Sequence, residues 1–287
     1  MRLGGFFGAS TTAELEPLCA KLDQYGLSAI SAPSACGEMS DDEVASYGET
    51  ARALGLVVGE WGYWENMMTP DGSLKKQRIQ GLRKVLQKAE VMGVPCVMTL
   101  VGTKHASDHA LAPEPYMFTE ACKAEFRELV LRVLDGLTLE TARYAIEPWC
   151  NTFFYQPEDI RAFIDSVDHP RFGVHLDQMN MVSFKDFYST TDLINRTFDL
   201  LGEHTCSVHL KDIGWDHTHM FLKWDEVYVG DGVMDYDTYL RRLAQLPADI
   251  SCYCEHMSEE SDYALNFERL HERAQAAGVQ FLSRGAQ

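Results

Sequence analysis

Short apolar runs alternate with longer segments of helical period along the whole chain, and the alternation repeats about eight times. Each short run, flanked by turn-forming residues, predicts a strand that is buried on both faces. The expected strands are Leu3–Phe7, Ala29–Ala32, Leu56–Trp61, Cys96–Val101, Tyr144–Glu147, Gly173–Asp177, Cys206–Leu210 and Ile250–Glu255.

The segments between these runs carry apolar residues at three- and four-residue spacing, which is typical of amphipathic helices. In the segment from Leu74 to Met92, Ile79, Leu82 and Leu86 fall on one stripe, and Gly93 follows as a stop. The expected helices are Thr11–Tyr25, Asp41–Leu54, Leu74–Met92, Thr119–Leu137, Pro157–Val167, Thr191–Leu201, Tyr236–Leu246 and Glu259–Ala277.

Strands that alternate with helices pair in parallel through right-handed crossovers, and eight such units close into a (β/α)8 barrel. An open doubly wound sheet is the alternative, but it needs a glycine-rich phosphate turn after the first strand. Gly4 and Gly5 lie within the first expected strand and Gly8 directly follows it, and these glycines do not form that turn. The predicted fold class is therefore α/β, a single TIM barrel domain over residues 1–287.

Two long stretches, Gly102–Tyr116 and Gly214–Asp235, carry no regular pattern and are expected to be irregular. Both follow strands, so both overhang the same end of the barrel. Long loops in that position often act as lids over a binding site.

Four metal-ligand residues stand at the ends of four successive expected strands: Glu147, Asp177, His209 and Glu255. Taken singly, such a carboxylate is usually a helix cap, and such a histidine is usually structural. The C-terminal ends of barrel strands, however, converge on one mouth. Three carboxylates and one imidazole there suit a divalent cation, Mn²⁺ or Mg²⁺ first, with Co²⁺, Fe²⁺ or Zn²⁺ also compatible.

The composition of the 287 residues excludes several partners. A net charge of −18 opposes nucleic acid, because such binding needs cationic side chains that displace counterions, and it also disfavours anionic membranes. No apolar run reaches the roughly 18 residues of a membrane span. The eight cysteines form no Cys-x-x-Cys pair, so free buried thiols are expected. The N-terminus lacks signal-peptide features, and we expect a cytoplasmic protein.

Four segments resemble the sugar phosphate isomerase/epimerase family, part of the xylose isomerase-like TIM barrel superfamily. They are His175-Leu-Asp-Gln-Met-Asn180, Val208-His-Leu-Lys-Asp212, Val229-Gly-Asp-Gly-Val-Met-Asp-Tyr236 and Cys254-Glu-His-Met-Ser-Glu-Glu-Ser-Asp-Tyr263. The resemblance spans most of the chain and implies that Glu147, Asp177, His209 and Glu255 bind one metal ion. In the ketose 3-epimerases of this superfamily, the two glutamate ligands also act as acid and base, which implies that Glu147 and Glu255 exchange a proton with the substrate.

The chain departs from the ketose 3-epimerases at three positions that grip their substrate. Those enzymes carry a second Glu, a His and an Arg where this chain has Phe153, Asn180 and Trp215. The resemblance therefore implies retained metal chemistry with a substrate other than a simple free ketose. The DNA-repair endonucleases of the same fold need further histidine ligands, and Asn180 replaces one of them.

Further polar and aromatic residues are expected at the mouth. Lys211 follows His209 by two residues and points to the same side of its strand, where it would stabilise an enolate oxygen or pair with Asp177 or Asp212. Aromatic rings stack on sugars, although they also serve ordinary packing. The candidate substrate-binding residues are Asn180, Trp61, Trp149, Trp215, His105 and His256.

The expected activity is that of a divalent-metal-dependent isomerase or epimerase acting beside the carbonyl of a keto-sugar. The loop after the last strand, 256–262, is acidic, so the substrate is expected to lack a phosphate. A second interpretation is a lyase that cleaves 3-oxo-glycosides, C- or O-linked, because some relatives make the same enolate and then expel the aglycone. A small partner subunit is expected in that case, and a homo-oligomer is also compatible. A third interpretation is a non-catalytic barrel that binds sugar.

Overall fold

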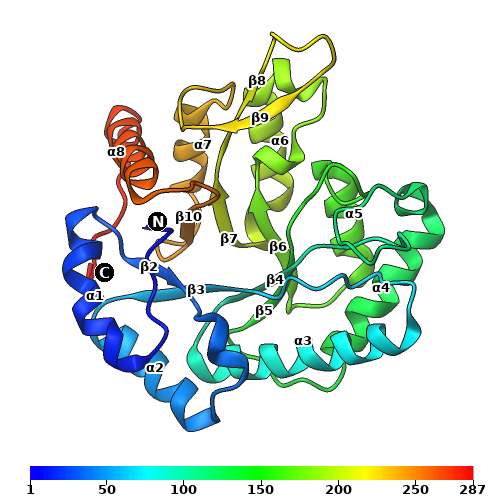
Figure 1. Ribbon diagram of the computed structural model, residues 1–287, viewed down its shortest axis with the longest axis horizontal. Coiled ribbons are helices and arrows are strands. Elements are labelled where there is room, and N and C mark those ends of the chain that lie inside the picture. Colours follow the sequence, from blue (N-terminus) through cyan, green and yellow to red (C-terminus); the bar gives the residue numbers. More distant parts are fainter. Residues whose placement is uncertain (287) are drawn as a thin grey trace.

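The eight expected strands form one parallel sheet that curves into a barrel (Figure 1). The computed structural model describes residues 1–286. The strands are β1 (Arg2–Gly4), β2 (Ala29–Ser31), β3 (Val57–Gly62), β4 (Cys96–Thr99), β5 (Arg143–Ile146), β6 (Phe172–Asp177), β7 (Thr205–Leu210) and β10 (Ser251–Cys254). Their order is β1-β10-β7-β6-β5-β4-β3-β2, and the amide of Ser28 donates to the carbonyl of Leu3 at 2.9 Å where the two ends meet. The predicted TIM barrel is confirmed.

Eight α-helices surround the barrel, one after each barrel strand (Figure 1). They are α1 (Thr12–Gln24), α2 (Asp41–Ala53), α3 (Gly72–Met92), α4 (Glu120–Leu134), α5 (Pro157–Val167), α6 (Thr190–Leu201), α7 (Tyr236–Leu243) and α8 (Glu260–Ala276). The ends follow the local chemistry, since Ser40 and Glu43 form a capping box at the start of α2 and Gly93 closes α3 at φ 86°. Helices α4 and α7 end three residues earlier than predicted.

Five short 3₁₀ helices lie in the connections between these elements. They are η1 (Ser34–Gly37), η2 (Pro115–Phe118), η3 (Met179–Met181), η4 (Asp186–Tyr188) and η5 (Gly202–His204). No helix within residues 1–286 is long and apolar enough to cross a bilayer.

Two parts of the structure differ from the sequence prediction. The first strand ends at Gly4 rather than Phe7, because Gly5 and Phe6 adopt φ values of 131° and 57°, which leave the extended region. The stretch Gly214–Asp235 is not irregular throughout. Its β9 (Trp224–Val227) pairs antiparallel with β8 (Asp212–Trp215), and this hairpin projects beyond the barrel (Figure 1).

The stretch Gly102–Tyr116 is irregular until η2 begins at Pro115. An ionic cluster ties it to the outer helices. Glu125 of α4 contacts the ammonium of Lys75 at 2.8 Å, that of Lys104 at 2.6 Å and the hydroxyl of Tyr116 at 2.9 Å. Burial opposes the charge of Glu125, but these three donors outweigh it and hold the pKa of Glu125 at about 2. The cluster therefore stabilises the loop only while Glu125 is ionised.

We expect Glu125→Gln to lower the free energy of unfolding by about 1 kcal/mol at pH 7, because the partly exposed cluster is screened by solvent. A folded pKa below the unfolded value of about 4.3 means that this stabilisation is complete above pH 4.5 and fades as pH falls toward 2. Urea unfolding at pH 7 and pH 3.5 should therefore show a smaller difference from wild type at the lower pH. Glu128→Gln, on the exposed side of the same helix, is the control. A difference that does not shrink with acid would contradict this account.

Candidate functional site

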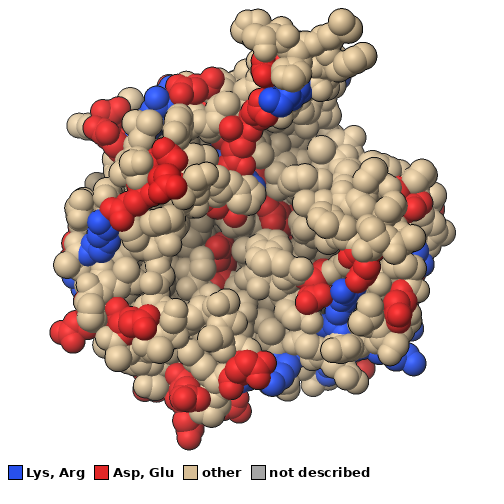
Figure 2. Space-filling view, viewed as in Figure 1, with Lys and Arg blue, Asp and Glu red and all other residues tan. Residues whose placement is uncertain are grey.

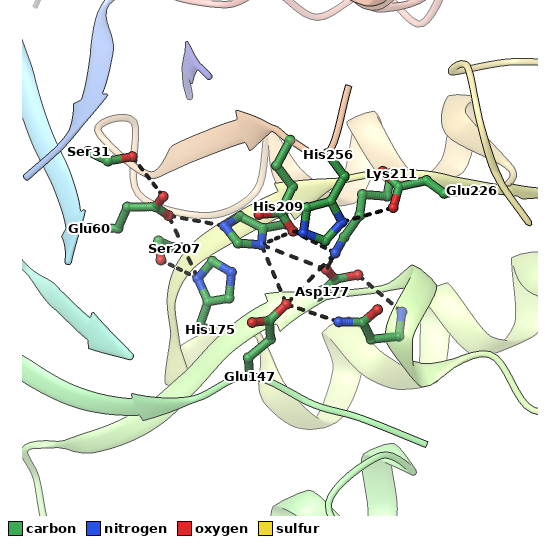
Figure 3. A network of polar contacts seen from close by, with 12 residues as sticks. Ser31, Glu60, Glu147, His175, Asp177, Ser207, His209, Lys211, Glu226 and His256 are labelled. Atoms are coloured by element: carbon green, nitrogen blue, oxygen red, sulfur yellow. Dashed lines mark hydrogen bonds and ion pairs between the residues drawn. The ribbon is translucent and has the colours of Figure 1, made fainter. Parts of the chain in front are cut away.

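The four predicted metal ligands lie together at the C-terminal ends of their strands, and Figure 3 shows three of them, Glu147, Asp177 and His209. Asp177 ends β6 and is register partner to His209 of β7, while Glu147 and Glu255 directly follow β5 and β10. One ligand atom from each of the four lies within 4.8 Å of those of the other three. The first and last of these ligands, Glu147 and Glu255, are 108 positions apart in the sequence. The strand order and the two-residue alternation of side chains bring them together.

The cluster is centred on the imidazole of His209. Its Nδ1 lies 2.7 Å from Glu255 Oε1, 3.5 Å from Glu147 Oε1 and 3.7 Å from Asp177 Oδ2. Three of the four side chains are buried, and only Glu255 reaches solvent, with 22% of its side chain exposed. Figure 2 shows a hollow on this face with acidic side chains inside it. The site is therefore a recessed anionic pocket that opens past Glu255.

Lys211 supplies a positive charge inside this pocket. Its Nζ lies 2.6 Å from Asp177 Oδ2, 2.5 Å from Glu255 Oε1 and 3.9 Å from Glu147 Oε1. Burial opposes the charge, but these three carboxylates outweigh it and raise the pKa of Lys211 above its usual range. The ion pair expected with Asp177 is present, whereas Asp212 serves another purpose.

Asp212 organises the loop behind the site. Its carboxylate accepts the backbone N–H groups of Gly230 at 2.8 Å, Met234 at 3.0 Å and Gly232 at 3.2 Å. A Cβ at Gly232 would lie 2.1 Å from Asp212 Oδ1, so only glycine fits there. The Gly-Asp-Gly segment is therefore part of a turn anchored by Asp212.

The carboxylates of Glu147 and Glu255 differ in their affinity for a proton. Burial raises the pKa of Glu147 to about 7. Burial acts on Glu255 in the same direction, but the charges of His209 and Lys211 outweigh it and hold the pKa of Glu255 at about 2. The pKa of His209 is well above its usual range, because its carboxylate neighbours, Glu255 first, outweigh its burial. Environments that separate two carboxylates in this way are typical of acid and base pairs.

Asn180 contacts the ligands rather than the open part of the pocket. Its Nδ2 donates to Glu147 Oε1 at 2.9 Å, and its backbone N–H donates to Asp177 Oδ1 at 3.1 Å. The residue lies in η3 directly after β6 and is buried. Asn180 thereby fixes one oxygen of each of two predicted ligands.

A cavity of about 500 Å³ leads from His209 and Glu255 toward the ends of β2 and β3. Trp61 lines it, together with Ser31 and Trp64, the last of which is 54% exposed. Its size falls in the usual range of small-molecule pockets, roughly 300 to 1,000 Å³.

The remaining predicted substrate residues lie outside the lining of this cavity. His256 is close to the cluster, with Nε2 3.6 Å from Glu255 Oε1 and Nδ1 2.9 Å from Glu226 Oε2. Trp215 packs edge-on against Phe187 at 5.9 Å, and His105 contacts Ser107 within its own loop. Trp149 is half-buried on the segment after β5. The roles predicted for these residues in substrate binding stay predictions.

Two buried residues of the site were not assigned a role from sequence. Glu60 on β3 lies with its Oε2 3.5 Å from His209 Nε2, and His175 on β6 stacks edge-on against His209 at 4.0 Å (Figure 3). A signal existed for each. Glu60 interrupts an apolar barrel strand, and His175 precedes Asp177 by two residues, so it faces the same side.

The donor set fits a divalent cation. Asp177 Oδ2, His209 Nδ1 and Glu255 Oε1 are buried and converge on one point, where they contact one another and Lys211 as ion pairs but make no hydrogen bond of regular geometry within residues 1–286. Buried polar atoms are rarely left in this state without an ion or water. One divalent cation together with the Lys211 ammonium would neutralise the three carboxylates.

This barrel, with carboxylates and an imidazole at the ends of its strands, defines a class of (β/α)8 proteins with a candidate metal centre. The sequence model of the family described as xylose isomerase-like TIM barrel matches residues 19–283, and the chain belongs to that family. No curated protein matches the chain in sequence.

Solved structures share the fold at low identity. An Escherichia coli 3-keto-D-glucoside 4-epimerase is similar at a TM-score of 0.67 and 15% identity, over 96% of this chain and 99% of that one. A D-psicose 3-epimerase crystallised in the presence of D-fructose is similar at a TM-score of 0.64 and 16% identity, over 97% of this chain and 100% of that one. A xylose isomerase-like TIM barrel protein from Mycobacterium smegmatis in complex with magnesium is similar at a TM-score of 0.63 and 16% identity, over 93% of this chain and 90% of that one.

The raised pKa of Glu147 predicts opposite effects of Glu147→Gln without and with metal. Its folded pKa of about 7 lies above the unfolded value, so metal-free protein loses stability as pH rises from about 4.5 to 7. In EDTA at pH 8, the neutral variant should therefore be more stable than wild type, by about 2 kcal/mol. With Mn²⁺, wild type should gain stability and the variant little.

Thermal unfolding in EDTA and in Mn²⁺ measures both effects. Glu226→Gln, which removes a carboxylate near His256 but outside the ligand set, should keep the full response to Mn²⁺. Equal stabilisation of wild type and Glu147→Gln by Mn²⁺ would exclude Glu147 as a ligand.

Proposed function

We propose that the protein is a divalent-metal-dependent sugar isomerase or epimerase that removes and returns a proton beside a carbonyl. The observation that carries this proposal is the pair Glu147 and Glu255, two carboxylates that reach the same imidazole from strands separated by β6 and β7. Membership of the xylose isomerase-like family and the likeness to solved sugar epimerases support it.

Glu147, Asp177, His209 and Glu255 would hold the cation, with Mn²⁺ as the first expectation. When bound, the cation polarises the oxygens of the substrate and makes the intervening C–H group more acidic. Glu255 would accept the proton, and Glu147, the other glutamate beside His209 Nδ1, would return a proton to the carbon.

Lys211 contributes charge stabilisation. Its ammonium lies between Asp177 and Glu255, close enough to interact with negative charge that develops on the carbonyl oxygen. Asn180 keeps Glu147 oriented by donating to one of its oxygens. Both roles would use contacts that the metal-free chain makes.

The surroundings favour an uncharged sugar. Glu60 lines the cavity beside Glu255, and no Lys or Arg within residues 1–286 lines it, so the cavity offers no cationic side chain to a phosphorylated or carboxylated substrate. The substrate class that fits best is therefore a neutral keto-sugar or a neutral oxidised glycoside.

The extent of the cavity favours a second candidate activity, cleavage of 3-oxo-glycosides. The space continues from Glu255 to the half-exposed ring of Trp64, where an aglycone or second ring would lie. Proton removal beside the keto group is the same first step, and the electron pair then expels the aglycone instead of returning to the carbon.

Incubation with Mn²⁺ in D₂O tests both activities on a 3-oxo-glucoside and on a free ketohexose. Solvent deuterium in the intact sugar supports isomerisation, and released aglycone supports elimination. Glu255→Gln should slow either reaction by at least about 100-fold, because it removes the base. Glu226→Gln should retain activity. If Mn²⁺ and sugar bind but the protein catalyses neither deuterium exchange nor aglycone release, both activities are contradicted and a non-catalytic binding barrel is indicated.

A further inference from the structure

Glu60 is a buried carboxylate on the opposite side of His209 from the predicted ligands. The residue is 5% exposed and points into the barrel from β3. Its Oε1 accepts a hydrogen bond from Ser31 Oγ at 2.9 Å. Its Oε2 has no hydrogen-bond partner within residues 1–286 and lies 3.5 Å from His209 Nε2. A buried carboxylate oxygen in this position needs a donor, and the ring of His209 is nearer to it than that of His175, whose Nδ1 lies 4.0 Å away.

The two ring nitrogens of His209 face different groups. Nδ1 lies 2.7 Å from Glu255 Oε1. Figure 3 shows the same nitrogen facing Glu147 and Asp177, whereas Nε2 faces Glu60. An imidazole that binds a metal through one nitrogen commonly donates its other N–H to a carboxylate, which fixes both the tautomer and the ring orientation.

We propose that Glu60 is a positioning residue that accepts the Nε2–H of His209 and keeps Nδ1 turned toward the place where Glu147, Asp177 and Glu255 would hold a cation. This inference rests on the proposed metal site and adds to it a carboxylate that touches neither the cation nor the substrate's reacting carbon. Ser31 completes the chain of contacts by holding the second oxygen of Glu60.

The packing around His209 supports this role. The ring of His175 lies edge-on against it, with centroids 4.0 Å apart and planes at 74°. His175 is itself fixed, since its Nδ1 lies 2.5 Å from Ser207 Oγ. His209 is thus held by a ring on one side and by a carboxylate at Nε2, so rotation about its side-chain bonds is restricted.

A second cation is the competing explanation, because ligand atoms of Glu60, His175 and His209 also lie within 4.8 Å of one another. To hold two cations, His209 would have to lose both ring protons and bridge them through both nitrogens. Neutral imidazole keeps one N–H, and Glu60 is placed to accept it. The positioning role therefore needs less unusual chemistry, and metal stoichiometry separates the two explanations.

Titration of Mn²⁺ into metal-free protein, followed by calorimetry and electron paramagnetic resonance, tests the proposal without relying on activity. Wild type should bind one Mn²⁺ per chain. Glu60→Met, which removes the acceptor, should raise the dissociation constant about 10- to 100-fold. Glu60→Gln retains an acceptor oxygen and should recover part of that loss. The visible spectrum of the Co²⁺-loaded protein should change in Glu60→Met.

Glu65→Gln is the matched control, since Glu65 lines the same cavity but pairs with Arg78 and should leave metal affinity unchanged. If wild type binds Mn²⁺ and both Glu60 variants bind it with the same dissociation constant, this inference is overturned and the proposed function stays intact. Two Mn²⁺ in wild type and one in Glu60→Met would overturn it in favour of a second cation. Failure of wild type to bind Mn²⁺ would contradict the proposed function itself.

Discussion

Repulsion among three carboxylates around one buried imidazole is the interaction on which the site depends. Glu147, Asp177 and Glu255 all lie within 3.7 Å of His209 Nδ1, where water cannot fully screen their charges. Without a divalent cation, the fold compensates with the Lys211 ammonium and with protons on His209 and Glu147, whose pKa values are raised. A cation would take the place of those protons, so metal binding and proton release are expected to be coupled.

The barrel around the site supplies the stability that this repulsion costs. Helices α1 to α8 and the apolar strands bury a large apolar core, and the stability of that core supports an electrostatically unfavourable mouth. Asp212 and Asn180 act as local supports, one for the Gly230–Met234 turn and one for two predicted ligands. Some polar residues near the mouth therefore face the pocket, and others hold the pocket-facing residues and loops in place.

Periodicity predicted the barrel because each apolar run and each helical stripe is a local signal. The predicted ligands were brought together for the same reason, since strand ends in a barrel share one mouth. The β8–β9 hairpin was missed because its strand Trp224–Val227 mixes charged and apolar residues and is only half-buried. Glu60 was missed because its partner, His209, is 149 positions away, and only the three-dimensional packing shows which nitrogen it faces. Trp149, Trp215 and His105 were chosen by residue type, which does not determine where a loop side chain points.

Anomalous diffraction from crystals soaked in Mn²⁺ tests the central claim most directly. The account predicts one anomalous peak, within coordination distance (about 2.0 to 2.3 Å) of Glu147, Asp177, Glu255 and His209 Nδ1, with Glu60 next to His209 Nε2. A peak elsewhere would contradict the account. So would the absence of a peak at saturating Mn²⁺, with Lys211 as the only cation between the three carboxylates.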